Sequence, residues 1–177
     1  MTRYKGRSYG ARYTVTPAAP STTTIHTAIT LPSSGTTTVT TGITNPDVPR
    51  CVSITGNASG ITGNVVITGT NMLGQTITDT IVADGTTTVQ GAKAFLTVTS
   101  IVVPVRNAPS DTIAIGRGTK LGLPVTLPHN TVIRTFYNNT LEGTPPTVAT
   151  SGTAIESNTA LLNTTLAGAV VDLYYLR

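Results

Sequence analysis

The chain has 177 residues, of which eleven are Lys or Arg and seven are Asp or Glu, giving a net charge of +4. A body of this size can bury about two thirds of its unfolded surface, and a single cysteine excludes a framework of intrachain disulfides. The first residues are polar and basic with no apolar run behind them, so we expect neither a signal peptide nor a transmembrane helix.

The opening stretch MTRYKGRSYGARYTVTPAAP carries the excess positive charge. No acid precedes Asp47, and from residue 13 onward seven basic residues balance seven acids. We predict that residues 1–20 form a basic N-terminal arm and that residues 21–177 form one β-sandwich domain. The arm residues expected to contact a partner are Arg3, Tyr4, Lys5, Arg7, Tyr9, Arg12 and Tyr13.

Three interpretations of this arm are open. It could be a solvated tail that improves solubility, or a nucleic-acid site in which Arg and Lys neutralise phosphate while Tyr stacks on bases. The favoured interpretation is an interaction arm, because Arg and Tyr are enriched at protein interfaces. Gly6 and Gly10 would give it freedom, and Pro17 and Pro20 would stiffen its exit from the body. Such an arm would bind an acidic neighbouring subunit.

The remainder of the chain consists of short segments rich in Val, Ile, Thr and aromatic residues, separated by turn signals. Such segments are typical of β-strands, and their regular spacing predicts an all-β fold, an antiparallel β-sandwich or jelly-roll-like barrel of about ten strands. The predicted strands span residues 22–31, 36–43, 49–56, 61–70, 75–83, 86–90, 94–105, 111–116, 131–138 and 169–176.

Local signals within this pattern predict specific turns and irregularities. Residues 71–74 should turn one strand back onto the next, and Asp84-Gly85 is a two-residue hairpin signal. The alternation slips at Thr99-Ser100, which predicts a bulge or bend. Residues 154–169 are the only candidate helix, and their β-branched and Asn content disfavours more than a turn or two.

The surface composition points to assembly with other subunits. Charged residues make up 10% of the chain, against about 25% in an ordinary soluble domain. Thr keeps the outward face of a strand polar without placing an ion there, so such a face costs less to bury than one of Lys and Glu. We therefore expect a surface covered by other subunits, in a homo-oligomer that is a trimer or a closed ring.

Two stretches in the middle of the chain carry a family resemblance. VVITGTNMLGQTITDTIVADGTTTVQGAKAFLTVTSIVVP (65–104) contains a T-G-T turn-and-strand unit and a K-x-F-x-x-V-T-S-I strand, and DTIAIGRGTKLGLPVTLP (111–128) contains a G-x-G-x-K-L-G-L-P loop. The chain thus resembles small β-rich structural proteins of tailed bacteriophages, over about a third of its length. The resemblance implies a virion component, either a capsid decoration protein or a head or tail component.

The residues that could carry chemistry form no recognisable motif. His26 and His129 have no metal ligands at a suitable spacing, and Cys51 precedes an alternating strand, which favours a buried packing thiol. In GRGTKLG, the spacing is not that of a P-loop, so Gly116 and Gly118 are expected to form a tight turn with Lys120 solvated. The acids show no close pair: Asp47, Asp79, Asp84, Asp111, Glu142, Glu156 and Asp172. We expect no catalytic residue, cofactor or metal.

The sequence therefore favours a non-enzymatic virion structural protein, assembled in the host cytoplasm. The first choice is a capsid decoration or cement protein whose partners are the phage capsid or neighbouring virion subunits, without nucleic acid or membrane. The alternative within the virion is a neck, head–tail joining or tail component. A carbohydrate-binding or adhesin-like surface module is a further alternative, disfavoured because the chain has no Trp and few aromatics.

Overall fold

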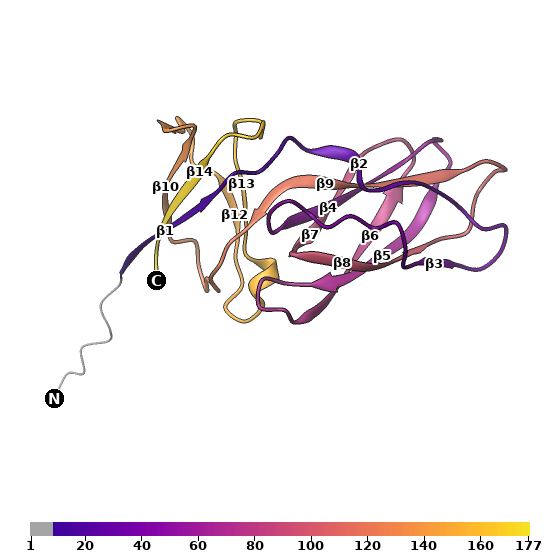
Figure 1. The fold of residues 1–177 in the computed structure, drawn as a ribbon, viewed down its shortest axis with the longest axis horizontal. Helices are drawn as coiled ribbons and strands as arrows, with labels where there is room; N and C mark the ends of the chain where they lie inside the picture. The colour runs from indigo at the N-terminus through magenta and orange to yellow at the C-terminus, as the bar shows by residue number, and fades with distance from the viewer. Residues whose placement is uncertain (1–8) are drawn as a thin grey trace.

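The computed structural model describes residues 9–177, and this part of the chain is all-β except for one 3-10 turn, as the sequence predicts (Figure 1). The strands are β1 Gly10–Val15, β2 Ser21–Thr30, β3 Thr37–Val39, β4 Arg50–Gly56, β5 Thr62–Thr70, β6 Thr76–Asp84, β7 Val89–Phe95, β8 Thr97–Val103, β9 Thr112–Gly122, β10 Val132–Tyr137, β11 Thr140–Leu141, β12 Thr147–Ala149, β13 Thr159–Leu161 and β14 Val171–Leu176; the 3-10 turn η1 is Ile155–Ser157.

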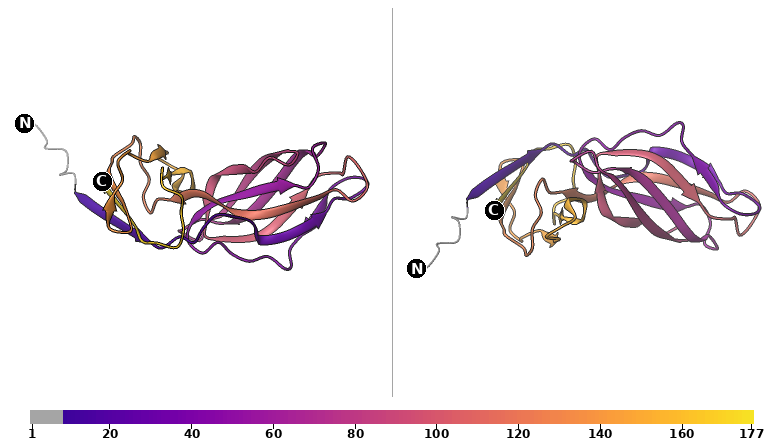
Figure 2. Two further views of the ribbon diagram at one scale, coloured as in Figure 1. Left: turned by 90° about the horizontal axis from the view of Figure 1, so that it is seen from above. Right: turned by 90° about the horizontal axis from the view of Figure 1, so that it is seen from below.

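The strands form two lobes, which lie end to end in Figures 1 and 2. The large lobe is a sandwich of strands β2–β9. One sheet has the order β3-β8-β5-β6, and the facing sheet contains β7, β4 and β9, with β2 also paired to β9. Strand β6 buries every second residue, as the TITDTIVAD alternation predicts. The core between the sheets contains Ile25, Val52, Ile54, Val65, Ile67, Phe95, Ile101, Ile113 and Ile115, among others.

The small lobe consists of β1 and β10–β14 together with the end of β9. One sheet has the order β1-β14-β10-β11, and β12 and β13 extend the sheet of β9. Its core is a separate cluster: Leu121, Leu123, Leu127, Ala160, Leu162, Leu166, Val171 and Leu173. The prediction of one sandwich over residues 21–177 therefore needs correction, because the last third of the chain builds a second core instead of completing the first.

The boundary of the predicted arm also needs correction. Residues 10–15 form strand β1, which pairs antiparallel with β14 from Gly10↔Leu176 to Val15↔Val171. The alternation of Ala11, Tyr13 and Val15 with smaller or polar residues suits a half-buried strand, and the inward residues pack on the small-lobe core. Residues 9–20 thus belong to the folded body.

The predicted local features are mostly confirmed. Residues 71–74 turn β5 onto β6, and the bulge falls at Thr99, since Thr68 pairs with Ser100 while Gly69 pairs with Val98. A tight turn does form at Asp84-Gly85, with Gly85 at φ 53°, but β6 and β7 lie in different sheets, so it is not a hairpin. The candidate helix over 154–169 is reduced to η1 and the short strand β13.

Candidate interaction site

The structure separates the residues of the predicted arm. Arg3, Tyr4, Lys5 and Arg7 lie outside the described residues. Tyr9 is 65% exposed and exchanges two backbone hydrogen bonds with Arg177. Arg12 lies on the outer face of β1, whereas Tyr13 packs against the small-lobe core, where burial, followed by the charge of Tyr175, raises its pKa to about 12. Tyr13 is therefore a core residue and not a contact for a partner.

Strand β1 presents an open edge. It is the terminal strand of its sheet, and Tyr9 pairs with Arg177 through N···O distances of 2.9 and 3.1 Å. Because hydrogen-bonded and non-hydrogen-bonded pairs alternate in an antiparallel ladder, the backbone groups of Gly10, Arg12 and Thr14 point away from β14. Within residues 9–177 these donors and acceptors have no hydrogen-bond partner, and a row of such groups is a template for strand addition.

The outer face of the same sheet is aromatic, aliphatic and cationic. We define it by six residues whose register positions place them opposite the small-lobe core: Arg12, Arg134, Phe136, Leu141, Tyr174 and Leu176. The Phe136 and Tyr174 rings meet edge to face, with centroids 5.7 Å apart, and the Arg12 guanidinium carbon lies 5.9 Å from the centre of the Tyr174 ring. Such T-shaped and cation–π arrangements stabilise an ordered surface.

Asp172 holds Arg12 in place on this face. Its Oδ1 accepts hydrogen bonds from the Thr14 hydroxyl at 2.6 Å and from Arg12 Nε at 2.9 Å, although its own side chain is only 8% exposed. The pKa of Asp172 is lower than that of a free carboxyl. The hydrogen bond from Thr14 has the largest lowering effect, and the hydrogen bond and charge of Arg12 lower the pKa further, whereas desolvation acts to raise it. Asp172 is thus a carboxylate that orients an exposed guanidinium.

This pairing makes the stability of the small lobe depend on pH. A carboxyl whose pKa is lower in the folded state stabilises the fold above its unfolded pKa, and the contribution is lost as the pH falls through the folded pKa. We expect Asp172→Asn to melt at a lower temperature than the wild type near neutral pH, and the difference to shrink at about pH 2. Thermal unfolding followed by circular dichroism at both pH values checks this. A pH-independent difference would show that the charge of Asp172 contributes nothing.

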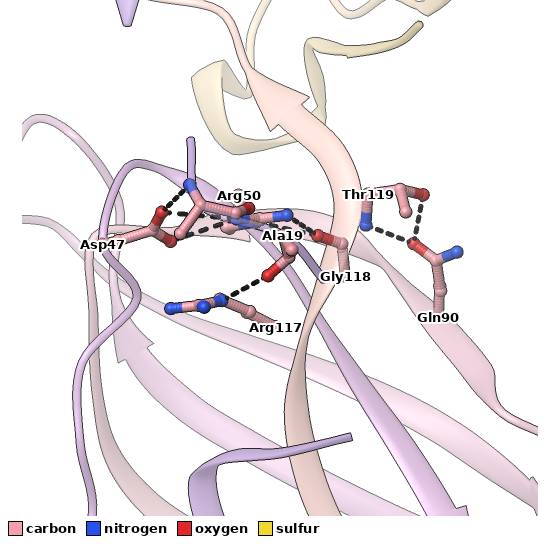
Figure 3. Close-up of polar contacts among 8 residues, drawn as sticks. Ala19, Asp47, Arg50, Gln90, Arg117, Gly118 and Thr119 are labelled. Atoms are coloured by element: carbon pink, nitrogen blue, oxygen red, sulfur yellow. Dashed lines mark hydrogen bonds and ion pairs between the residues drawn. The ribbon is translucent and has the colours of Figure 1, made fainter. Parts of the chain in front are cut away.

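A second polar cluster joins the two lobes, around the fully buried side chain of Arg50 (Figure 3). Its Nε donates to the carbonyl of Gly118 at 2.7 Å, and its Nη2 donates to the same oxygen. Its Nη1 donates to the carbonyl of Ala18 at 3.0 Å and to Asp47 Oδ1 at 3.1 Å. Burial lowers the pKa of Arg50, and the charge of Asp47 opposes that effect. Arg50 therefore ties the segment between β1 and β2 to strands β4 and β9.

Neighbouring contacts extend this junction along β9. Arg117 Nε donates to the Ala19 carbonyl at 2.8 Å, and Gln90 Oε1 accepts from both the backbone N–H and the hydroxyl of Thr119, at 2.8 and 2.9 Å (Figure 3). The predicted turn at Gly116 and Gly118 is wrong, because residues 112–122 form one continuous strand. Glycine is needed at position 116 for close approach: a Cβ there would overlap the carbonyl oxygen of Ser21.

The other candidate residues lie apart from one another. Cys51 is buried, as predicted, and burial raises its pKa. Among residues 9–177, no three His, Cys, Asp or Glu side chains come together as metal ligands. The pocket beside Arg117 and Gln90 has a volume of about 200 Å³, and the pockets beside Glu142 and beside His129 have about 300 and 340 Å³, at most the lower end of the roughly 300–1,000 Å³ typical of ligand pockets. The outer face of the β1-β14-β10-β11 sheet is therefore the stronger candidate for an interaction.

Of the six residues on this face, only Arg12 was predicted from the sequence to contact a partner. A signal was present in VIRTFY, where apolar and aromatic residues occur on both faces of β10, a pattern typical of strands covered on both sides.

Comparisons with protein-family models, curated proteins and solved structures find no match to this chain. No helix within residues 9–177 has the length and apolar character needed to cross a membrane.

Proposed function

We propose that this chain is a non-enzymatic structural protein of a tailed-phage virion, and specifically a capsid decoration or cement protein. The observation that carries the proposal is the small-lobe sheet, which leaves an open edge at β1 and an outer face of Arg, aromatic and aliphatic side chains. Arg and aromatic residues are the side chains enriched in the core of protein interfaces, so this sheet suits attachment to a neighbouring subunit.

Two further features support the proposal. The motifs on which the resemblance to phage structural proteins rests lie mainly in β5–β9, which belong to the large lobe and join it to the small one. The lobes are also tied to each other by Arg50 and by a hydrogen bond from Asn71 Nδ2 in the β5–β6 turn to Glu156 in η1, at 3.2 Å. A module whose two lobes are linked by hydrogen bonds, and whose small lobe carries the attachment surface, is suited to holding adjacent capsid subunits together.

Protein stoichiometry in purified particles tests this function. We expect quantitative mass spectrometry of gradient-purified particles to find the chain in roughly hundreds of copies, as a protein that follows the lattice symmetry of a capsid should be. A count of about a dozen would place it in a single ring at the neck or tail. Absence of the chain from particles would refute the virion role altogether.

A further inference from the structure

The outer face of the β1-β14-β10-β11 sheet presents apolar side chains to solvent. Of the eight large hydrophobic side chains that are strongly exposed in the described part of the chain, Leu141 at 52% and Leu176 at 38% lie on this face. The Phe136 and Tyr174 rings on the same face are half-buried. Because exposed apolar side chains gathered on one face mark interaction sites, this concentration indicates a surface that a partner covers.

The charge of this face is positive. Arg134 is exposed and forms no ion pair within residues 9–177, where the only two are Arg12–Asp172 and Arg50–Asp47. A surface that presents cations among apolar side chains is complementary to one that presents carboxylates among apolar side chains.

A second copy of this chain offers few such carboxylates. Six of its seven acids already accept hydrogen bonds within the described structure, and Asp84 is the exception. Asp79 and Asp111 are also buried. Pairing of the face with itself would set one positively charged surface against another, which is unfavourable between like charges. The complementary surface is therefore on a different protein.

Nucleic acid fits the face less well. Protein–DNA interfaces are more polar and much more positively charged than protein–protein interfaces, whereas Leu141 and Leu176 offer aliphatic groups that phosphate does not bind. From the apolar exposure and the charge together, we propose that the outer face of the small-lobe sheet is a docking surface for a different protein that carries carboxylates flanked by apolar side chains. This identifies the chemistry of the attachment partner and rests on the proposed structural function.

The test compares face variants with matched variants of the large lobe. Arg134→Glu and Leu141→Ser change the face. The matched controls in the large lobe are Arg106→Glu, in the loop after β8, and Val82→Ser, on β6, where Val82 is 59% exposed. The probe is a labelled random copolymer of glutamate and tyrosine, with polyglutamate and oligo-dT as comparisons. We expect saturable binding of the copolymer, stronger than that of polyglutamate, weakened by salt, and reduced about tenfold or more by either face variant.

Several results would overturn the inference. Equal binding by face and control variants, or no binding of the copolymer, would remove the docking surface; tighter, variant-sensitive binding of oligo-dT would assign it to nucleic acid. Self-association in sedimentation, abolished by Leu141→Ser, would assign it to a second copy. The proposed function fails separately: if the wild type is absent from particles, the virion role falls while the copolymer result stands. Full occupancy by Arg134→Glu and Leu141→Ser in particles would refute the docking surface and leave the virion role intact.

Discussion

Arg50→Met is expected to lower the free energy of unfolding by about 3 kcal/mol, because it removes a fully buried guanidinium that donates to two backbone carbonyls and to the partly exposed carboxylate of Asp47. Met fills similar volume but donates no hydrogen bond, so the carbonyls of Gly118 and Ala18 lose their guanidinium donor and Asp47 loses its cation. Unsatisfied polar groups in a buried position cost about 1–3 kcal/mol each. Urea unfolding followed by circular dichroism measures the change.

Two further variants make this result specific. Arg134→Met removes an exposed arginine and is expected to change the free energy of unfolding by no more than about 0.5 kcal/mol. Arg50→Lys keeps the charge but not the planar fork of donors, so its stability should fall between those of the wild type and Arg50→Met. A loss below about 1 kcal/mol for Arg50→Met would mean that water replaces the guanidinium and that the junction does not depend on it.

Gly116→Ala is expected to cost about 3 kcal/mol or more, at the upper end of the overpacking range. A Cβ at this position would overlap the carbonyl of Ser21, which is backbone and cannot rotate away. Strand β2 would have to move off β9, breaking the pairing of Ser21 with Arg117. Thermal and urea unfolding of the purified variant measure the loss, and a large fall in soluble expression is expected to accompany it.

Gly143→Ala is the matched control for this substitution. No atom lies within 4 Å of a Cβ built on Gly143, so this variant should stay within about 0.5 kcal/mol of the wild type. If Gly116→Ala were equally mild, β2 would be loosely attached to β9, and the large lobe would tolerate displacement of that strand.

The sequence predicted those features that depend on neighbouring residues. The period-two alternation of β6, the turn at residues 71–74 and the bulge at Thr99 each have their cause within a few positions of the chain. The division into two lobes has a distant cause, since β1 pairs with β14 and Arg12 meets Asp172 across 160 positions. A glycine that lets another strand approach closely looks the same in the sequence as a glycine in a turn. The extended conformation of residues 116–118 therefore could not be predicted.

The candidate site was predicted only in part for the same reason. Composition alone indicated that Arg and Tyr near the N-terminus contact a partner, and this holds as a proposal for Arg12. Which tyrosine faces inward depends on register: Tyr13 lies opposite Leu173 and turns into the core, while Arg12 lies opposite Tyr174 on the outer face. Arg134 lies on that face in β10 and Leu141 in β11. The sequence did not predict the sheet to which these strands belong.

Strand β9 has a mechanical consequence. It runs unbroken over Thr112–Gly122, pairs with β2 and β4 in the large lobe, and ends on β13 beside the small-lobe core. Inter-strand hydrogen bonds in an antiparallel sheet lie perpendicular to the strands, so a tensile load passing from one lobe to the other along β9 pulls on its hydrogen bonds in shear. In that geometry the bonds of each regularly paired stretch share the force, and the register shifts against β2 and β4 divide the ladders of β9 into such stretches.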